Sequence, residues 1–337
     1  MSKQTTLGDF FAIKNKKRSI FYIDWTHPFP KAQWLTDKPS SINFEAQVKW
    51  KELNTVVTIC CNDSNDRPYK IPPELKYKNT ALLKSHLQKC VRRQLTDKAL
   101  KTSWHLIKLD INAFIRRLPI IMLEDVDIHD SLSTIIWLIA AISKGYLPDY
   151  KQISWLLGVV VYISNNKQYG KLENNHASEE INIPSLIKKI NNNNNLSDMK
   201  KDLLYSLLFR VSYGGMKGDM NMFYNYAKKY CENINNASLY SPIIPIECST
   251  LIDLEVDEIE ISSADFHCYP QIIKMIASKF PQYTNDQIKK CIWDCNSKYN
   301  SRYDQISQLI DKKMGKIWEN IQSYIQHLQK HLIESSH

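Results

Sequence analysis

A group of acidic side chains lies in the stretch LEDVDIHD, which contains Glu124, Asp125 and Asp127. Clustered carboxylates can hold Mg²⁺ for phosphodiester hydrolysis, because this hard cation prefers oxygen ligands and can share them with a phosphate. In the alternative interpretation Glu124 or Asp125 pairs with Arg116 or Arg117, since a charge tolerates burial only when it has a partner. The stretch is therefore a candidate metal site or a structural ion-pair cluster.

A second group stands in SADFHCYP, where Asp265 and His267 are two residues apart. This pair can join a metal site if further ligands come from elsewhere in the fold. Together with the first carboxylates it would form the catalytic set of a metal-dependent nuclease with Mg²⁺ as cofactor. Without that chemistry no cofactor is expected. The alternative is that Ser263 or Asp265 caps the following helix and His267 makes a local hydrogen bond.

Three of the eight glycines lie in the stretch RVSYGGMKGDM, residues 210–220. Glycine lets the backbone approach a ligand closely, and Arg210 and Lys217 are suited to contact phosphate. The structural alternative is a loop between two helices with Gly214 or Gly215 after the first helix. Neither GxxxxGK[ST] nor GxGxxG occurs in the sequence, so we do not expect the chain to be an ATPase.

A spaced apolar set opens the chain in the stretch QTTLGDFF. In a 3₁₀ turn residues three apart lie on one side, so Gln4, Leu7 and Phe10 would line up with Phe11 beside them. The pattern resembles the PIP box, Gln-x-x-aliphatic-x-x-aromatic-aromatic, which docks on the sliding clamp known as proliferating cell nuclear antigen. All four defining positions match, and the resemblance implies this clamp as a partner. In the alternative, the apolar side chains pack on the protein's own body.

Basic residues follow this motif immediately. Together with the two basic residues of the glycine-rich stretch they are the predicted DNA contacts: Lys14, Lys16, Lys17, Arg18, Arg210 and Lys217. The net charge of 44 − 35 = +9 is compatible with a nucleic-acid partner. The run before residue 19 can also serve as a nuclear import signal.

The whole composition is that of a globular intracellular protein. Of the 337 residues 43% are hydrophobic, and the eight cysteines form no CxxC pair, which favours reduced thiols over disulfides or structural zinc. No stretch has the roughly 18 apolar residues that a membrane span needs. We expect a nuclear location or a cytoplasmic viral replication site, with no secretion and no membrane partner.

Helical periodicity dominates the chain from residue 80 onward and would position these candidate groups. The spacing predicts helices over 80–93, 96–110, 111–126 with a break at Pro119, 131–145, 149–164, 199–215, 219–234, 263–281 and within 285–332. Thr80 and Thr96 are the predicted caps of the first two. Strands are predicted over 44–50 and 54–61. Cys291 and Cys295, four residues apart, are expected to face a core.

These elements predict a mainly α fold, an orthogonal helical bundle with a small N-terminal β or irregular cap and a disordered N-terminal arm. The expected divisions are an arm over 1–20, a cap over 21–78, a helical core over 79–240 with a polar insertion at 164–200, and a C-terminal helical region over 241–337.

One helical region also resembles a known family. The stretches LKSHLQKCVRR, DKALKTSWHLIKLD and AFIRRLPIIMLEDVDIHD follow one another within residues 80–142. This order is similar to the helical region that follows the ATPase core in the RarA/MgsA branch of clamp-loader relatives. The resemblance implies a shared helical arrangement and no ATPase activity, because the Walker elements are absent.

The leading hypothesis is a non-catalytic DNA replication or repair factor that is tethered to the sliding clamp and whose helical body contacts DNA or a partner protein. The first alternative is a clamp-recruited, metal-dependent nuclease. The second is a scaffold whose N-terminal segment packs on its own body.

Overall fold

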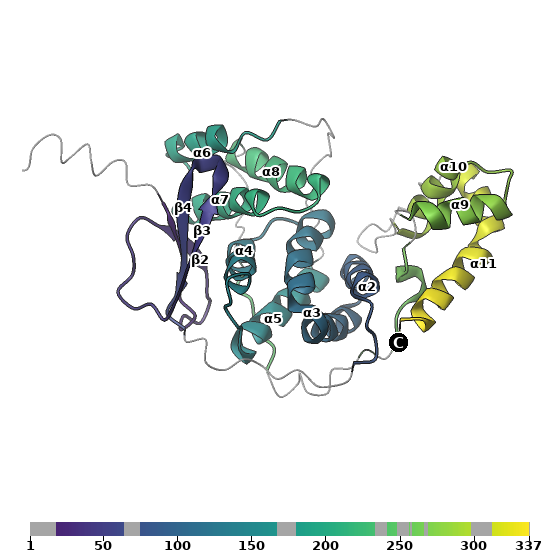
Figure 1. Ribbon diagram of the computed structural model, residues 1–337, viewed down its shortest axis with the longest axis horizontal. Helices are drawn as coiled ribbons and strands as arrows, with labels where there is room; N and C mark the ends of the chain where they lie inside the picture. Colours follow the sequence, from purple (N-terminus) through teal and green to yellow (C-terminus); the bar gives the residue numbers. More distant parts are fainter. Residues whose placement is uncertain are drawn as a thin grey trace, which may run out of the picture. The chain divides into compact units, whose positions relative to one another are not determined.

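The computed structural model describes residues 18–63, 75–166, 180–232, 241–247, 256, 258–265, 269–297 and 312–336. These residues form a mainly helical protein with ten α-helices and one four-stranded mixed sheet near the N-terminus (Figure 1). The predicted fold class is therefore confirmed. The predicted arm up to residue 17 lies outside the described residues. No described helix is long and apolar enough to cross a membrane.

The chain forms two compact units that are interleaved in sequence. Unit 1 comprises residues 1–68, 128–149 and 172–242, and unit 2 comprises 69–127, 150–171 and 243–337. This differs from the predicted division into consecutive domains. The reason is long-range packing. For example, Trp137 from the predicted helical core donates its indole N–H to the Phe21 carbonyl in the predicted cap, at 2.9 Å.

The sheet of unit 1 has the strand order β2-β1-β4-β3. Its strands are β1 (Ile20–Ile23), β2 (Ala32–Leu35), β3 (Phe44–Trp50) and β4 (Thr55–Cys61). β1 runs parallel to β4, and the other two pairs are antiparallel. The two predicted strands are confirmed as β3 and β4. β1 and β2 were not predicted, because four residues are too few for a periodic pattern to stand out.

The helices of unit 1 are α4 (Ser131–Ile142), α6 (Ile183–Asn192), α7 (Asp198–Ser212) and α8 (Lys217–Glu232). Aromatic side chains fill the space between the sheet and α7, where Phe21 stacks on Trp34 with ring centroids 4.4 Å apart. α6 lies inside the segment that was predicted as a polar insertion. Its four apolar side chains are buried in spite of the asparagines around them, which obscured their helical spacing.

Unit 2 contains α2 (Thr80–Arg92), α3 (Thr96–Asp125) and α5 (Tyr150–Asn165). α3 is interrupted at Asp110, where φ is −160° and ψ is 92°, and Pro119 lies within the helix. The predicted break at Pro119 is therefore wrong. Asp110 starts a new helical segment because its Oδ1 accepts the N–H of Ala113 at 3.0 Å, as a capping side chain does.

The C-terminal part of unit 2 has its own hydrophobic cluster. It is built by α9 (Pro270–Lys279), α10 (Asn285–Ile292) and α11 (Lys312–Glu334), with the π-helical turn η4 (Trp293–Ser297) after α10. Cys291 is fully buried and Cys295 packs against the same cluster, as predicted. The predicted helix start at Ser263 or Asp265 is wrong. α9 begins at Pro270, whose fixed φ suits the first helical position.

Candidate charged site on helix α2

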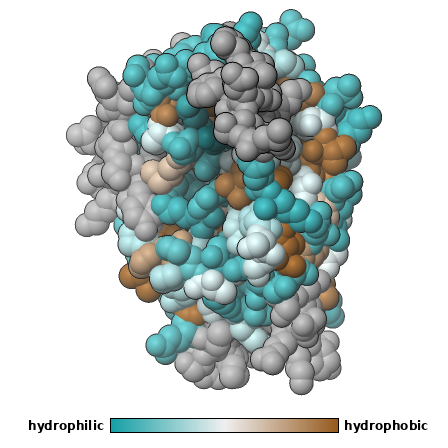
Figure 2. Space-filling model, turned by 90° about the vertical axis from the view of Figure 1, so that its left-hand side faces the viewer, coloured by the Kyte–Doolittle hydropathy of each residue, from teal (hydrophilic) through white to brown (hydrophobic). Residues whose placement is uncertain are grey.

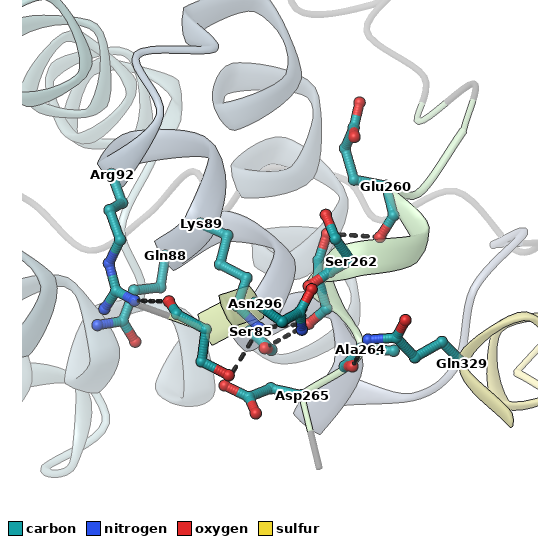
Figure 3. Close-up of polar contacts among 12 residues, drawn as sticks. Ser85, Gln88, Lys89, Arg92, Glu260, Ser262, Ala264, Asp265, Asn296 and Gln329 are labelled. Carbon is teal, nitrogen blue, oxygen red and sulfur yellow. Dashed lines mark hydrogen bonds and ion pairs between the residues drawn. The ribbon is translucent and has the colours of Figure 1, made fainter. Parts of the chain in front are cut away.

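Helix α2 carries an apolar and a polar side, and the polar side is buried as well. Leu83, Leu87 and Val91 are fully buried in the core of unit 2. The side chains of Ser85, Lys89 and Arg92 recur every three or four residues and so share another face of the helix. They meet the end of α3, the 3₁₀ turn η3 (Ile261–Ser263) and neighbouring residues of unit 2 (Figure 3).

The first ion pair joins Arg92 to Asp125. The Arg92 Nε lies 2.6 Å from Asp125 Oδ1, and its Nη2 lies 3.3 Å from Oδ2. The amide nitrogen of Gln88 donates to Asp125 Oδ2 at 2.8 Å and to Glu124 Oε2 at 2.5 Å. Burial alone would lower the pKa of Arg92, but the Asp125 carboxylate outweighs this effect and raises it. Asp125 is therefore charge-compensated.

The second ion pair joins Lys89 to Asp265. Lys89 is 3% exposed, and its Nζ lies 3.2 Å from Asp265 Oδ2 and 3.2 Å from the carbonyl oxygen of Ser263. Burial lowers the pKa of Lys89 to about 8, although the Asp265 charge opposes this shift. Asp265 therefore serves as the counter-ion of a buried lysine.

The residues before Asp265 are held by further polar contacts. Glu260 forms an ion pair with Lys98 and donates its backbone N–H to His86 Nε2 at 3.3 Å. The other ring nitrogen of His86 lies 2.8 Å from Thr102 Oγ1. Arg93 donates to the Ser262 hydroxyl at 2.7 Å. The segment around η3 is thus bound to α2 and α3 by both side-chain and backbone groups.

This arrangement is suited to neutralising buried charge. Asp125 and Asp265 each face a basic side chain, and Glu124 accepts from Gln88. Glu124 is exposed as a residue. The surrounding protein still removes water from its carboxylate, and this desolvation together with the nearby Asp125 charge raises its pKa. In the described part of the chain, no group of three or more His, Cys, Asp or Glu side chains is arranged to hold a metal ion. The described carboxylates Asp125 and Asp265 are thus held by basic side chains, and Glu124 by an amide.

The acidic stretch has a basic partner that was not predicted. Asp125 pairs with Arg92, while the charge of Arg117, one of the two predicted partners, acts on Glu124 and opposes the rise in its pKa. Arg117 also donates to the side-chain oxygen of Gln88 and so supports the amide that holds Glu124. Asp127 is half-buried and has interactions of its own. The predicted His267 lies outside the described residues.

The predicted DNA contacts are scattered. Arg210 is 2% exposed, donates to the Gly214 carbonyl at 2.7 Å and lies over the Phe223 ring at 5.3 Å. Its prediction as a phosphate contact is corrected, because a buried guanidinium cannot reach DNA. Lys217 is exposed at the start of α8.

Arg18 begins the described chain, with Nη1 2.8 Å from Asp202 Oδ1 and Nη2 2.5 Å from Asp198 Oδ1. The other predicted N-terminal residues lie outside the described residues: Gln4, Leu7, Phe10, Phe11, Lys14, Lys16 and Lys17.

The sequence interpretation missed the basic half of the α2 site. Lys89, Arg92 and Arg93 stand in LKSHLQKCVRR at the three- and four-residue spacing that places side chains on one helical face. A run of acidic residues precedes Asp265 in the sequence. Searching for opposite charges on predicted neighbouring elements could have found the pairing, but not its geometry.

Comparisons with protein-family models, with curated proteins and with solved structures each find no match. The α2 site belongs to a mainly helical protein in which a buried ion-pair network joins separate segments of one unit.

Proposed function

We propose that this protein is a non-catalytic accessory factor of DNA replication or repair that binds a sliding clamp of the proliferating cell nuclear antigen type. The observation that carries the proposal is the spacing of Gln4, Leu7, Phe10 and Phe11, which matches all four defining positions of the clamp-binding motif. The basic residues that follow the motif support a role beside DNA, because the clamp encircles the duplex.

The binding energy of such a motif is adequate for regulated recruitment. Burying a leucine and two phenylalanines in a clamp pocket contributes about 5–8 kcal/mol before the cost of ordering the segment. Taken without the ordering cost, this range corresponds to dissociation constants between about 200 µM and about 1 µM, as suits a reversible contact. Tethering then raises the local concentration of the body at DNA into roughly the millimolar range.

The body begins close to the motif in sequence. The chain is attached to α7 through the ion pairs of Arg18 with Asp198 and Asp202. From Phe11 to Arg18 the chain advances 18 − 11 = 7 residues, which spans at most about 25 Å when fully extended. A bound motif would therefore hold unit 1 near the clamp.

The α2 site supports the non-catalytic part of the proposal. A divalent cation would have to displace Arg92 from Asp125 and Lys89 from Asp265 before it gained those carboxylates. Breaking buried pairs costs several kcal/mol because it leaves uncompensated charge. The network therefore fits a structural role better than a metal-dependent reaction.

The test is binding of the full chain to a purified sliding clamp, measured by isothermal titration calorimetry. We expect the double variant Phe10→Ala/Phe11→Ala to lose about a hundredfold in affinity or more, because aromatic anchors dominate such interfaces. The matched control is Thr5→Ala/Thr6→Ala, which changes two residues at undefined positions of the same motif. Its affinity should stay within about threefold of the parent chain.

Unchanged binding by the phenylalanine variant would refute the proposal, and so would no binding by the parent chain. Thermal unfolding of both variants is measured in parallel. A large loss of stability in Phe10→Ala/Phe11→Ala alone would instead favour the scaffold alternative, in which these rings pack on the body.

A further inference from the structure

The two outer strands of the sheet differ in how their open edges are treated. On β2, the outward N–H of Ala32 donates to Thr134 Oγ1 and that of Trp34 donates to Asp202 Oδ1, both at 3.1 Å. Side chains of α4 and α7 thus occupy this edge. An uncovered strand edge is a template for pairing with another chain. The other outer strand of the sheet is β3.

The direction of the β3 backbone groups follows from its neighbours. In β4, the N–H of Thr58 donates to the Ser19 carbonyl at 2.9 Å, on the β1 side. Because backbone groups alternate along a strand, the odd-numbered residues of β4 face β3. The register places Val57 opposite Val48. The even-numbered residues of β3 are therefore bonded to β4.

The backbone groups of Glu45, Gln47 and Lys49 consequently point to the open edge. Among the residues that the structure describes, none makes a hydrogen bond to their outward N–H groups. The three side chains are also exposed. Figure 2 looks at the side on which the strands lie in Figure 1, and its coloured atoms mix hydrophilic and hydrophobic residues rather than forming one broad apolar patch. The outward residues of β3 are polar or charged, so recognition at this strand would rest on backbone hydrogen bonds and on charge.

The exposed side chains of β3 are complementary to themselves. Two copies of β3 that run antiparallel with Gln47 on the two-fold axis place Glu45 of one copy opposite Lys49 of the other, twice. Opposite charges directly across an antiparallel pair are stabilising. In the same register the outward-directed residues face one another, which forms about six hydrogen bonds between the chains.

We propose that β3 is a self-association edge, at which a second copy of this chain pairs antiparallel about Gln47 and extends the sheet across a two-fold axis. The interface is isologous, as in most homodimers. The inference is independent of clamp binding, since it uses no residue of the N-terminal motif.

Charge variants test the register. In Glu45→Lys, positions 45 and 49 both carry lysine, and in Lys49→Glu they both carry glutamate. A dimer of either variant alone therefore places like charges opposite each other across the axis. We expect each to dimerise about tenfold more weakly than the parent chain in sedimentation equilibrium. An equimolar mixture restores both attractive pairs and should form the mixed dimer with about the parent affinity. Glu45 also pairs with Lys38 of its own chain, so the mixture is the decisive measurement.

A backbone variant tests the edge itself. Gln47→Pro removes an N–H that is not used within the sheet, and proline is tolerated on an open edge for this reason. We expect it to abolish dimerisation, whereas the control Gln47→Ala retains it. Both variants should keep the parent circular dichroism spectrum.

Two results would overturn the proposal. One is a parent chain that stays monomeric up to about 200 µM, a concentration at which even weak homodimers form. The other is a dimer that is insensitive to Gln47→Pro and to the charge variants, since it would use another surface. A chain that remains monomeric because another protein pairs with its β3 edge would equally contradict self-association.

Discussion

Lys89, Arg92 and Asp125 are charged residues that have almost no exposed surface. Removing such groups from water is costly, and their mutual attraction offsets this cost only with good geometry and further hydrogen bonds. Gln88 supplies one of those bonds to Asp125, and the Ser263 carbonyl supplies one to Lys89. At the residue scale, unit 2 is therefore held together in part by interactions that must all be present at once.

His86 is a fully buried neutral side chain and gives the stability a pH dependence. Burial lowers its pKa from 6.5 to about 4. Between these values the unfolded chain binds a proton that the folded chain does not, so the free energy of unfolding falls as the pH falls below about 6.5. Within this range, each unit by which the pH falls lowers the free energy of unfolding by about 1.4 kcal/mol. Above pH 6.5 the residue adds no pH dependence.

Urea denaturation of the parent chain and of His86→Gln at about pH 7 and about pH 5 gives the change in the free energy of unfolding on acidification. We expect this change to differ between the two proteins. The parent chain should lose about 2 kcal/mol more than the variant on acidification, because only the parent carries this histidine. The pKa of His129 is also lowered by burial, so His129→Gln shows how specific the effect is. Equal losses in the parent and in His86→Gln would contradict the assignment.

At the scale of single elements, the two predicted helix caps were each displaced by one residue. α2 was predicted to start with Thr80 as cap, but Asn79 takes this role, and its Oδ1 accepts the N–H groups of Ala81 and Leu82 at 3.0 and 3.1 Å. α3 was predicted to be capped by Thr96, but the cap position is Leu95 and no side chain bonds to the helix there. Both predictions were wrong by one residue.

Asn79→Ala should therefore destabilise the protein by about 1 kcal/mol, the usual cost of losing a capping side chain. Thr80→Ala should change the free energy of unfolding by no more than about 0.5 kcal/mol. Chemical denaturation of the two variants measures both values. The cap assignment fails if the threonine variant is the less stable one. Asn79→Ser, which restores an acceptor, should recover most of the loss.

At the scale of the whole molecule, the net charge of +9 is expected to act mainly through the basic segment near the clamp-binding motif. The buried Arg210 and the paired Arg18 are not free to contribute. DNA affinity should therefore depend on Lys14, Lys16 and Lys17. This expectation rests on their charge and their place in the sequence, because these lysines lie outside the described residues.

Replacing these three lysines by glutamine should reduce the slope of log affinity against log salt for duplex DNA by about 2–3, since each phosphate contact contributes about 0.9. Fluorescence anisotropy over a salt series gives this slope. The control replaces Lys274, Lys289 and Lys290, which are exposed on α9 and α10, by glutamine. If both triple variants lose the same slope, overall charge alone explains the DNA binding.

Local patterns predicted a large share of the fold. The periodicity of residues such as Leu83, Leu87 and Val91 identified α2 and its buried face, and the content of valine, threonine and aromatic residues identified β3 and β4. The short strands and α6 were missed, because four residues or an asparagine-rich context leave little periodic signal. The candidate carboxylates were recognised from the sequence, but their basic partners were not, since those partners are brought close only by folding.

The sequence by itself determined the helical class, the excess of positive charge and the motif spacing on which the clamp proposal rests, because these are properties of residues close together in the chain. Only the tertiary structure decided that Asp125 meets Arg92, that Asp265 meets Lys89, and that the chain forms two interleaved units. It also covered the β2 edge with side chains of α4 and α7, whereas no described residue bonds to the outward N–H groups of β3. Contacts of this kind join residues far apart in sequence, and they are fixed by the packing of the whole core rather than by any local preference.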